Sequence, residues 1–215
     1  MDRNHLLLYA VTPQEDENIL LPKIERALAG GVTLLQLREK RLCGRALEEK
    51  ALAVKRLCDR YKVPLVINDN VELAQAIGAA GVHLGAGDMP VDLARRRLGN
   101  GKIIGATART VEQALAAQAA GADYLGSGAV FATSTKADAV PMPHGLLGKI
   151  CRSVQIPVVA IGGIDESNIA ELQGLPIFGV AVAAGIFGAA DVKKAAENLA
   201  RQAKLMLGYT GEKHE

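Results

Sequence analysis

The feature that most constrains the fold is a strict alternation of short apolar runs with longer amphipathic segments. Eight apolar runs of strand length lie at residues 6–11, 32–37, 64–67, 81–84, 102–106, 122–126, 156–161 and 178–182. Helical patterns follow them at about 17–29, 44–61, 71–77, 91–98, 111–120, 146–154, 167–172 and 191–207. Runs that are apolar at consecutive positions are typical of parallel strands buried on both faces. Eight such units predict an α/β fold, a (β/α)8 TIM barrel with eight parallel strands.

The joints between helices and the strands that follow them resemble one another. Three of them read Ala29-Gly-Gly-Val32, Ala79-Ala-Gly-Val82 and Ala119-Ala-Gly-Ala122. Glycine at such a joint can end a helix in the left-handed conformation. No linker or low-complexity stretch interrupts the pattern, so we expect one barrel domain over residues 1–215, with 208–215 as a polar tail. The first strand is not followed by Gly-x-Gly-x-x-Gly, which disfavours a dinucleotide-binding fold.

Composition narrows the classes of partner. Apolar residues make up 49% of the 215, whereas aromatic residues make up 3% and tryptophan is absent. A packed core is therefore feasible, but an aromatic platform for single-stranded nucleic acid is not indicated. The net charge of +2 suggests neither a nucleic-acid nor a membrane partner. Residues 179–190 are too few to span a bilayer, and no signal peptide is recognisable.

Three unevenly spaced cysteines, Cys43, Cys58 and Cys151, disfavour a disulfide framework and a zinc site. We therefore expect a cytoplasmic protein. The sequence leaves the oligomeric state open, a homo-oligomer included.

In a barrel of this kind the loops that follow the strands form the active site at one end. Polar residues or glycines follow most of the predicted strands: Gln36 to Lys40, Asn68 and Asp69, Asp88, Thr107 and Arg109, Thr133 to Lys136, Gly162 and Gly163, and Ala183 and Ala184. Because all these positions are expected at one end of the barrel, they are candidates for a common site.

The loop after the sixth predicted strand has the composition of a phosphate site. Thr133, Ser134 and Thr135 are consecutive hydroxyls, and Lys136 follows directly. Hydroxyls, free backbone N–H groups and an ammonium are the partners that phosphate oxygens need. Taken alone, the run would fit a polar surface loop equally well. Glycines 162 and 163 favour the phosphate interpretation, because bare backbone can approach an anion closely.

Asp69 and Asp88 follow neighbouring predicted strands. Two carboxylates with room for water suit Mg²⁺, which prefers oxygen ligands and usually bridges to substrate phosphates. Either aspartate could instead cap the helix that follows it. His83 lies inside an apolar run, so we expect a core or supporting histidine rather than a catalytic one.

The motifs at these positions resemble those of the thiamine-phosphate synthase and thiazole tautomerase family. The resemblance covers nearly the whole chain, and its motifs lie at residues 30–40, 67–69, 81–85 with Asp88, 133–139 and 160–164. It implies a transferase of thiamine biosynthesis. In the synthase branch, hydroxymethylpyrimidine diphosphate loses diphosphate to leave a pyrimidine-methyl cation. The nitrogen of a thiazole phosphate then captures this cation.

The resemblance also implies roles for individual residues. The pyrimidine diphosphate would be held by the run Gln36, Leu37, Arg38, Glu39 and Lys40, together with Asn68, Thr107 and Lys136. Arg38, Lys40 and Lys136 would be catalytic, because they face the charge that develops on the leaving diphosphate. Mg²⁺ would bind Asp69 and Asp88. The thiazole phosphate would be held by Thr133, Ser134, Thr135, Gly163, Ala183 and Ala184.

Four positions depart from the family pattern. The family typically has glutamine at Ala86, serine at Thr107, histidine at Arg109 and serine at Ala184. The tautomerase branch uses a histidine near the end of the fifth strand, and an arginine there cannot cycle a proton near neutral pH. The intact run from Thr133 to Asp138 also favours the synthase branch. The other alternative is a non-catalytic protein that keeps the phosphate pockets.

Overall fold

The computed structural model describes residues 2–133 and 141–208. Its eight strands are β1 Leu8–Val11, β2 Leu34–Leu37, β3 Leu65–Asn68, β4 Gly81–Leu84, β5 Ile103–Thr107, β6 Tyr124–Gly128, β7 Val158–Ile161 and β8 Gly179–Val182. Each strand pairs in parallel with its neighbours in the sequence, and β8 pairs with β1 to close the ring. The predicted (β/α)8 barrel is therefore confirmed.

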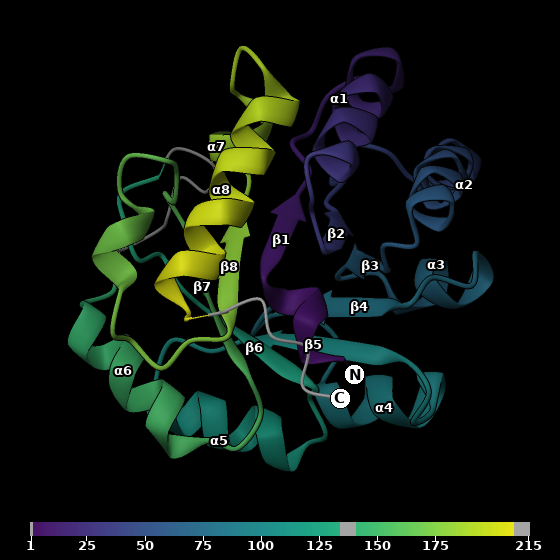
Figure 1. The fold of residues 1–215 in the computed structure, drawn as a ribbon. Helices are drawn as coiled ribbons and strands as arrows, with labels where there is room; N and C mark the ends of the chain where they lie inside the picture. Colours follow the sequence, from purple (N-terminus) through teal and green to yellow (C-terminus); the bar gives the residue numbers. More distant parts are fainter. Residues whose placement is uncertain (1, 134–140, 209–215) are drawn as a thin grey trace, which may run out of the picture.

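The helices lie outside the ring of strands (Figure 1). They are α1 Glu17–Ala29, α2 Gly44–Tyr61, α3 Val71–Ala76, α4 Val91–Leu98, α5 Val111–Ala119, α6 His144–Ser153, α7 Ala184–Phe187 and α8 Val192–Met206. Two short 3-10 helices, η1 Arg3–Leu6 and η2 Ile169–Leu172, complete the described elements. Within the described residues, no helix combines the length and apolar character needed to cross a membrane.

Two elements differ from the sequence-based expectation. The helix expected at 167–172 is the 3-10 helix η2, because the Asp165 and Asn168 side chains close a tight turn before it. Helix α7, only four residues long, follows β8 directly and was not expected. Left-handed glycines do lie at the helix–strand joints, at Gly31 and Gly121, but at the second joint the left-handed glycine is Gly78 rather than Gly81.

The core has two parts. Most buried apolar side chains lie between the strands and the outer helices. A second, smaller cluster of eight buried residues fills the inside of the barrel: Leu6, Tyr9, Val11, Leu34, Val66, Tyr124, Val159 and Ala181. Because side chains alternate along a strand, the residue two positions after Leu34, Val66 or Ala181 again faces the interior, at the mouth of the barrel: these are Gln36, Asn68 and Ala183.

Glycines inside the barrel make room for aromatic rings. A Cβ on Gly105 would lie 2.2 Å from Cζ of Tyr124, and a Cβ on Gly126 would lie 3.1 Å from Cε1 of His83. The rings of Tyr9, His83 and Tyr124 can therefore meet across the interior, with centroids 5.6 to 6.4 Å apart. These rings form the layer directly beneath the mouth.

Candidate active site

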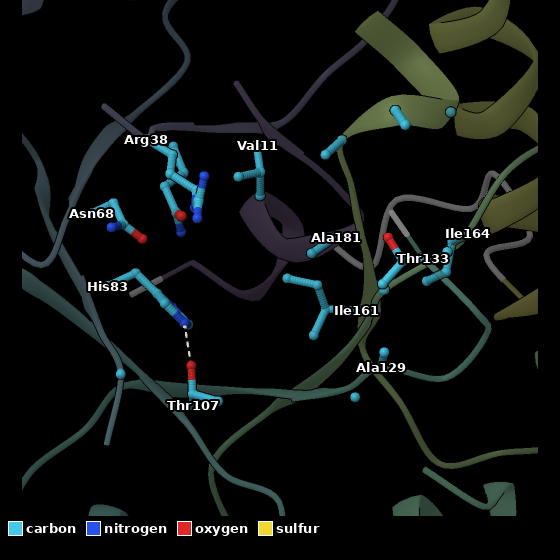
Figure 2. A pocket seen from close by; sticks show the side chains of 18 of the residues that line it. Val11, Arg38, Asn68, His83, Thr107, Ala129, Thr133, Ile161, Ile164 and Ala181 are labelled. Atoms are coloured by element: carbon cyan, nitrogen blue, oxygen red, sulfur yellow. Dashed lines mark hydrogen bonds between the residues drawn. The ribbon is translucent and has the colours of Figure 1, made fainter. Parts of the chain in front are cut away.

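A cavity of about 380 Å³ opens at the carboxyl ends of the strands. Figure 2 shows Arg38 and Asn68 on one side of it and Thr133 and Ile164 on the opposite side. The sequence-predicted residues that line this cavity are Gln36, Arg38, Lys40, Asn68, Asp69, Asp88, Thr107, Thr133, Gly163, Ala183 and Ala184. Residues from most strand ends therefore converge on one pocket. Ser134, Thr135 and Lys136 lie outside the described residues.

Two residues of the predicted binding run turn away from the pocket. Leu37 is 2% exposed and packs in the outer core. The Glu39 carboxylate forms an ion pair with Lys50 of α2, at 2.6 Å, and neither residue lines the cavity. The side chains alternate through the end of β2 and into the loop after it: Gln36, Arg38 and Lys40 line the cavity, whereas Leu37 and Glu39 between them do not.

The acidic side of the pocket is formed after β3 and β4. The Asp69 and Asp88 carboxyls are within hydrogen-bonding reach of each other, and Nζ of Lys40 lies 3.1 Å from Oδ2 of Asp69. Burial and the hydrogen bond with Asp88 raise the pKa of Asp69. Burial would also raise the pKa of Asp88, but hydrogen bonds from Asp69 and the Gly85 backbone outweigh it and lower that pKa.

Asp69 does not serve as a helix cap. The Asn70 side chain caps α3 instead, by accepting a hydrogen bond of 2.8 Å from the Leu73 backbone N–H. Asp69 has a positive φ of 63°, in the left-handed region, which turns its side chain to the pocket. Asp88 has a partly structural role, since its Oδ2 accepts a 2.6 Å hydrogen bond from the Gly85 N–H.

The acidic pair fits a divalent cation. Two carboxyls held this close repel each other when both are ionised, and a cation between them would remove that repulsion. Within the described ranges, no group of three or more His, Cys, Asp or Glu side chains could surround a metal. A metal here would therefore take its remaining ligands from water and substrate oxygens, as Mg²⁺ usually does.

A chain of buried polar side chains forms the floor beneath this side. Gln36 donates to the Tyr9 hydroxyl, which lies 2.9 Å from the Tyr124 hydroxyl. The Tyr124 hydroxyl lies 3.0 Å from Nδ1 of His83, whose Nε2 lies 3.1 Å from Oγ1 of Thr107 (Figure 2). Burial lowers the pKa of His83 to about 4, so its imidazole is neutral at physiological pH. Both ends of this chain, Gln36 and Thr107, line the pocket.

The sequence predicted that His83 would be a core residue or would support the site from behind. In the structure it is buried and also borders the cavity. It is 7% exposed, yet it lines the cavity and contacts Thr107. The apolar part of the lining was missed, namely Val11, Ala129, Ile161 and Ala181. The register would have revealed one of them, since Val11 pairs with the predicted site residue Gln36.

The opposite side of the pocket is built mainly from backbone. Gly162 and Gly163 have φ values of 100° and 69°, and a Cβ on Gly163 would lie 2.3 Å from the Ala132 carbonyl oxygen. Only glycine allows this approach. The loop after β6 is held against the glycines by a 3.0 Å hydrogen bond from the Phe131 N–H to the Gly162 carbonyl. Thr133, at the end of this described segment, faces the same cavity.

Comparison with known proteins identifies relatives over most of the chain. Residues 8–186 match the family described as thiamine monophosphate synthase. The thiamine-phosphate synthase of Ruminiclostridium cellulolyticum is 46% identical over 194 residues, 89% of this chain and 92% of that protein. The thiamine-phosphate synthase of Lacticaseibacillus paracasei is 44% identical over 96% of this chain and 98% of that one.

A solved structure agrees with these relatives. The thiamine phosphate pyrophosphorylase from Pyrococcus furiosus superposes with a TM-score of 0.87 at 39% identity. The match covers 96% of this chain and 99% of that one.

Proposed function

Since the chain belongs to the thiamine monophosphate synthase family, we propose that it joins hydroxymethylpyrimidine diphosphate to hydroxyethylthiazole phosphate and releases diphosphate. The family is one of transferases in thiamine biosynthesis, and this chain is such an enzyme. The individual substrates and the residues that act on them belong to our proposal.

One observation carries the proposal: a single cavity has two sides whose groups suit two different anions. On one side lie Arg38, Lys40 and the Asp69–Asp88 pair, which suit a diphosphate with a divalent cation. On the other lie Thr133 and the glycines after β7, which suit a monophosphate held by hydroxyl and backbone groups. A pocket for two substrates, one with a diphosphate and one with a phosphate, needs both sides.

The proposed reaction breaks the bond between the pyrimidine methylene carbon and the diphosphate oxygen. The bonding electron pair leaves with the diphosphate, and the methylene carbon becomes cationic. The thiazole nitrogen lone pair then forms the new carbon–nitrogen bond. No proton transfer is required for either change.

The residues of the pocket would act mainly on charge. Arg38, Lys40 and Lys136 would bind the diphosphate more tightly as it becomes a free anion, which lowers the barrier to its departure. Mg²⁺ held by Asp69 and Asp88 would neutralise part of that charge. Apolar side chains would surround the reacting carbon and keep water from the cation; they are Val11, Ile161 and Ala181.

The tautomerase alternative needs a group that cycles a proton. Arg109, which lines the pocket, occupies the position where that branch has histidine, and a guanidinium does not serve as a group that cycles a proton. His83 also lines the pocket, but Tyr124 and Thr107 engage its two nitrogens, and burial lowers its pKa to about 4. These contacts favour the synthase.

The direct test is to supply both substrates with Mg²⁺ and to measure diphosphate and thiamine phosphate. We expect Mg²⁺-dependent formation of both products, lost with a chelator and restored by Mg²⁺. Asp69→Ala and Lys136→Ala should each lower turnover by orders of magnitude. Asp59→Ala, which removes an exposed carboxylate from α2, is the matched control and should not. Circular dichroism shows whether each variant is folded.

The alternatives give different results in the same assay. Binding of the thiazole phosphate without diphosphate release would identify a non-catalytic binding protein. A shift of a double bond in a thiazole precursor, without condensation, would identify a tautomerase. Wild-type turnover in Asp69→Ala would show that the site is misplaced.

A further inference from the structure

An ion pair lies buried directly behind the cationic side of the pocket. Oε2 of Glu39 is 2.6 Å from Nζ of Lys50, and the two side chains are 1% and 3% exposed. Neither residue lines the cavity. Removing two charges from water offsets most of their attraction, so such a pair is a poor source of stability. Its effect on the conformation of the neighbouring loops is therefore of interest.

Lys50 joins the loops after β1 and β2. Its ammonium donates to the Glu39 carboxylate in the loop after β2 and, at 2.8 Å, to the Glu15 carbonyl in the loop after β1. The Glu15 carboxylate is itself held by Lys23 of α1, at 2.7 Å. One ammonium from α2 thus fixes two loops that are separate in sequence.

The backbone on either side of Glu39 is fixed as well. The Arg38 N–H donates to Oγ1 of Thr12 at 3.0 Å, and the Lys40 N–H donates to Oε1 of Gln14 at 3.1 Å. Thr12 and Gln14 belong to the same loop as the carbonyl that Lys50 holds. The Glu39 carboxylate also accepts a 2.8 Å hydrogen bond from the Arg41 N–H, which closes the turn after the cations.

This arrangement determines where two pocket cations point. An anchored side chain fixes the backbone of its own residue, and with it the directions in which the two adjacent side chains leave the chain. Here Glu39 is anchored outward, and Arg38 and Lys40 line the cavity, with Lys40 beside Asp69. A lost anchor would free the loop to rotate, and both cations would move together.

We propose that Glu39 and Lys50 are positioning residues, which act through Arg38 and Lys40 to hold both cations at the diphosphate side of the pocket. The substrate named in this proposal rests on the proposed function above. The ion pair itself touches no substrate. Its contribution is the fixed geometry of the loop between β2 and α2.

The test replaces the pair by apolar side chains of similar length, in the double variant Glu39→Met with Lys50→Met. Because no charge is left unpaired, the melting temperature should stay the same or rise. The value of kcat/KM for the pyrimidine diphosphate should fall by about 100-fold, as expected when catalytic groups move by about 1 Å. The KM for the thiazole phosphate should change little, because that phosphate binds the opposite side.

Control variants separate positioning from general effects on α2. Lys55→Met makes the same change five residues further along α2, at a lysine whose ion pair with Asp59 is more exposed, and activity should be retained. Lys50→Arg keeps the charge and should retain more activity than Lys50→Met. If the double variant fails to fold, Glu39→Gln with Lys50→Met takes its place, because it leaves no charge unpaired and keeps an acceptor for the Arg41 N–H, and it should show a smaller fall in kcat/KM with an unchanged fold.

A binding measurement separates this proposal from the proposed reaction. The probe is inorganic diphosphate with Mg²⁺, titrated into each folded variant by calorimetry. Weaker binding in the double variant than in Lys55→Met supports the positioning role, even if the unsubstituted protein proves inactive. A folded double variant that binds diphosphate and turns over like the unsubstituted protein would overturn it. A loss of activity that only follows a loss of stability would also overturn it.

Discussion

The Tyr124 hydroxyl is the central link of the polar chain beneath the pocket, and Tyr124→Phe removes it alone. This hydroxyl lies 2.9 Å from the Tyr9 hydroxyl and 3.0 Å from Nδ1 of His83. The phenyl ring still fits, since the space beside Gly105 accommodates the ring as well as the hydroxyl. The substitution therefore tests the hydrogen bonds rather than the packing.

The expected destabilisation follows from what each partner loses. Tyr9 keeps its bond from Gln36, so the lost bond on that side costs about 1 kcal/mol. Nδ1 of His83 becomes a buried polar atom without a partner, which costs about 1–3 kcal/mol. The free energy of unfolding should therefore fall by about 2–4 kcal/mol. For a chain of this size the melting temperature should drop by roughly 4–16 °C.

The assay is thermal and urea unfolding followed by circular dichroism, with Tyr61→Phe as the matched control. Tyr61 ends α2 and packs at the edge of the outer core, and its hydroxyl has no hydrogen-bond partner among residues 2–133 and 141–208. Its loss should change the free energy of unfolding by less than about 0.5 kcal/mol. If the two variants unfold at the same temperature and urea concentration, the buried chain is not a significant source of stability and our reasoning is wrong.

Two further predictions concern the same pocket. Burial lowers the pKa of His83 from its usual 6.5 to about 4, so the unfolded chain takes up this proton first as the pH falls. Protonation of His83 should therefore lower the free energy of unfolding by about 3 kcal/mol between pH 6.5 and 4. The variant His83→Gln should lack that part of the decline. If the free energy of unfolding falls equally with pH in both proteins, this prediction is wrong. Gly163→Ala should lower stability by more than Gly174→Ala, and should weaken binding of the thiazole phosphate as measured by calorimetry. Both glycines have positive φ, but a Cβ at Gly163 would collide with the Ala132 carbonyl, whereas a Cβ at Gly174 would have no atom within 4 Å. Equal losses of stability in the two variants would refute the steric argument.

The barrel itself was predictable because its signal is repeated along the chain. Each apolar run predicts a buried strand, and few folds other than the barrel have eight such strands in alternation with helices. The 3-10 helix η2 and the four-residue α7 were not predictable in the same way. Elements this short have no full period of apolar residues, so tertiary contacts rather than local pattern decide their conformation.

Site residues were predictable where a charged side chain directly follows a predicted strand. Asp69, Asp88 and Lys40 follow strands, and the closed barrel brings them together. The direction of Glu39 was not predictable, because it depends on Lys50, which a helix supplies from a different layer. The Tyr9–Tyr124 contact joins residues 115 positions apart, and no local pattern encodes such a pair.

The backbone of Asp69 has a consequence for how this protein would respond to selection for heat resistance. A left-handed conformation costs most residues other than glycine about 1–2 kcal/mol and costs aspartate less, because its short polar side chain can hydrogen-bond locally; glycine would relieve what remains. Random variants screened only for survival at high temperature should therefore repeatedly replace this aspartate. The selected variants would be more stable and would keep the cavity, but they would lack one of the two carboxylates that we propose as Mg²⁺ ligands. A thermostability screen on this chain must therefore monitor turnover alongside melting.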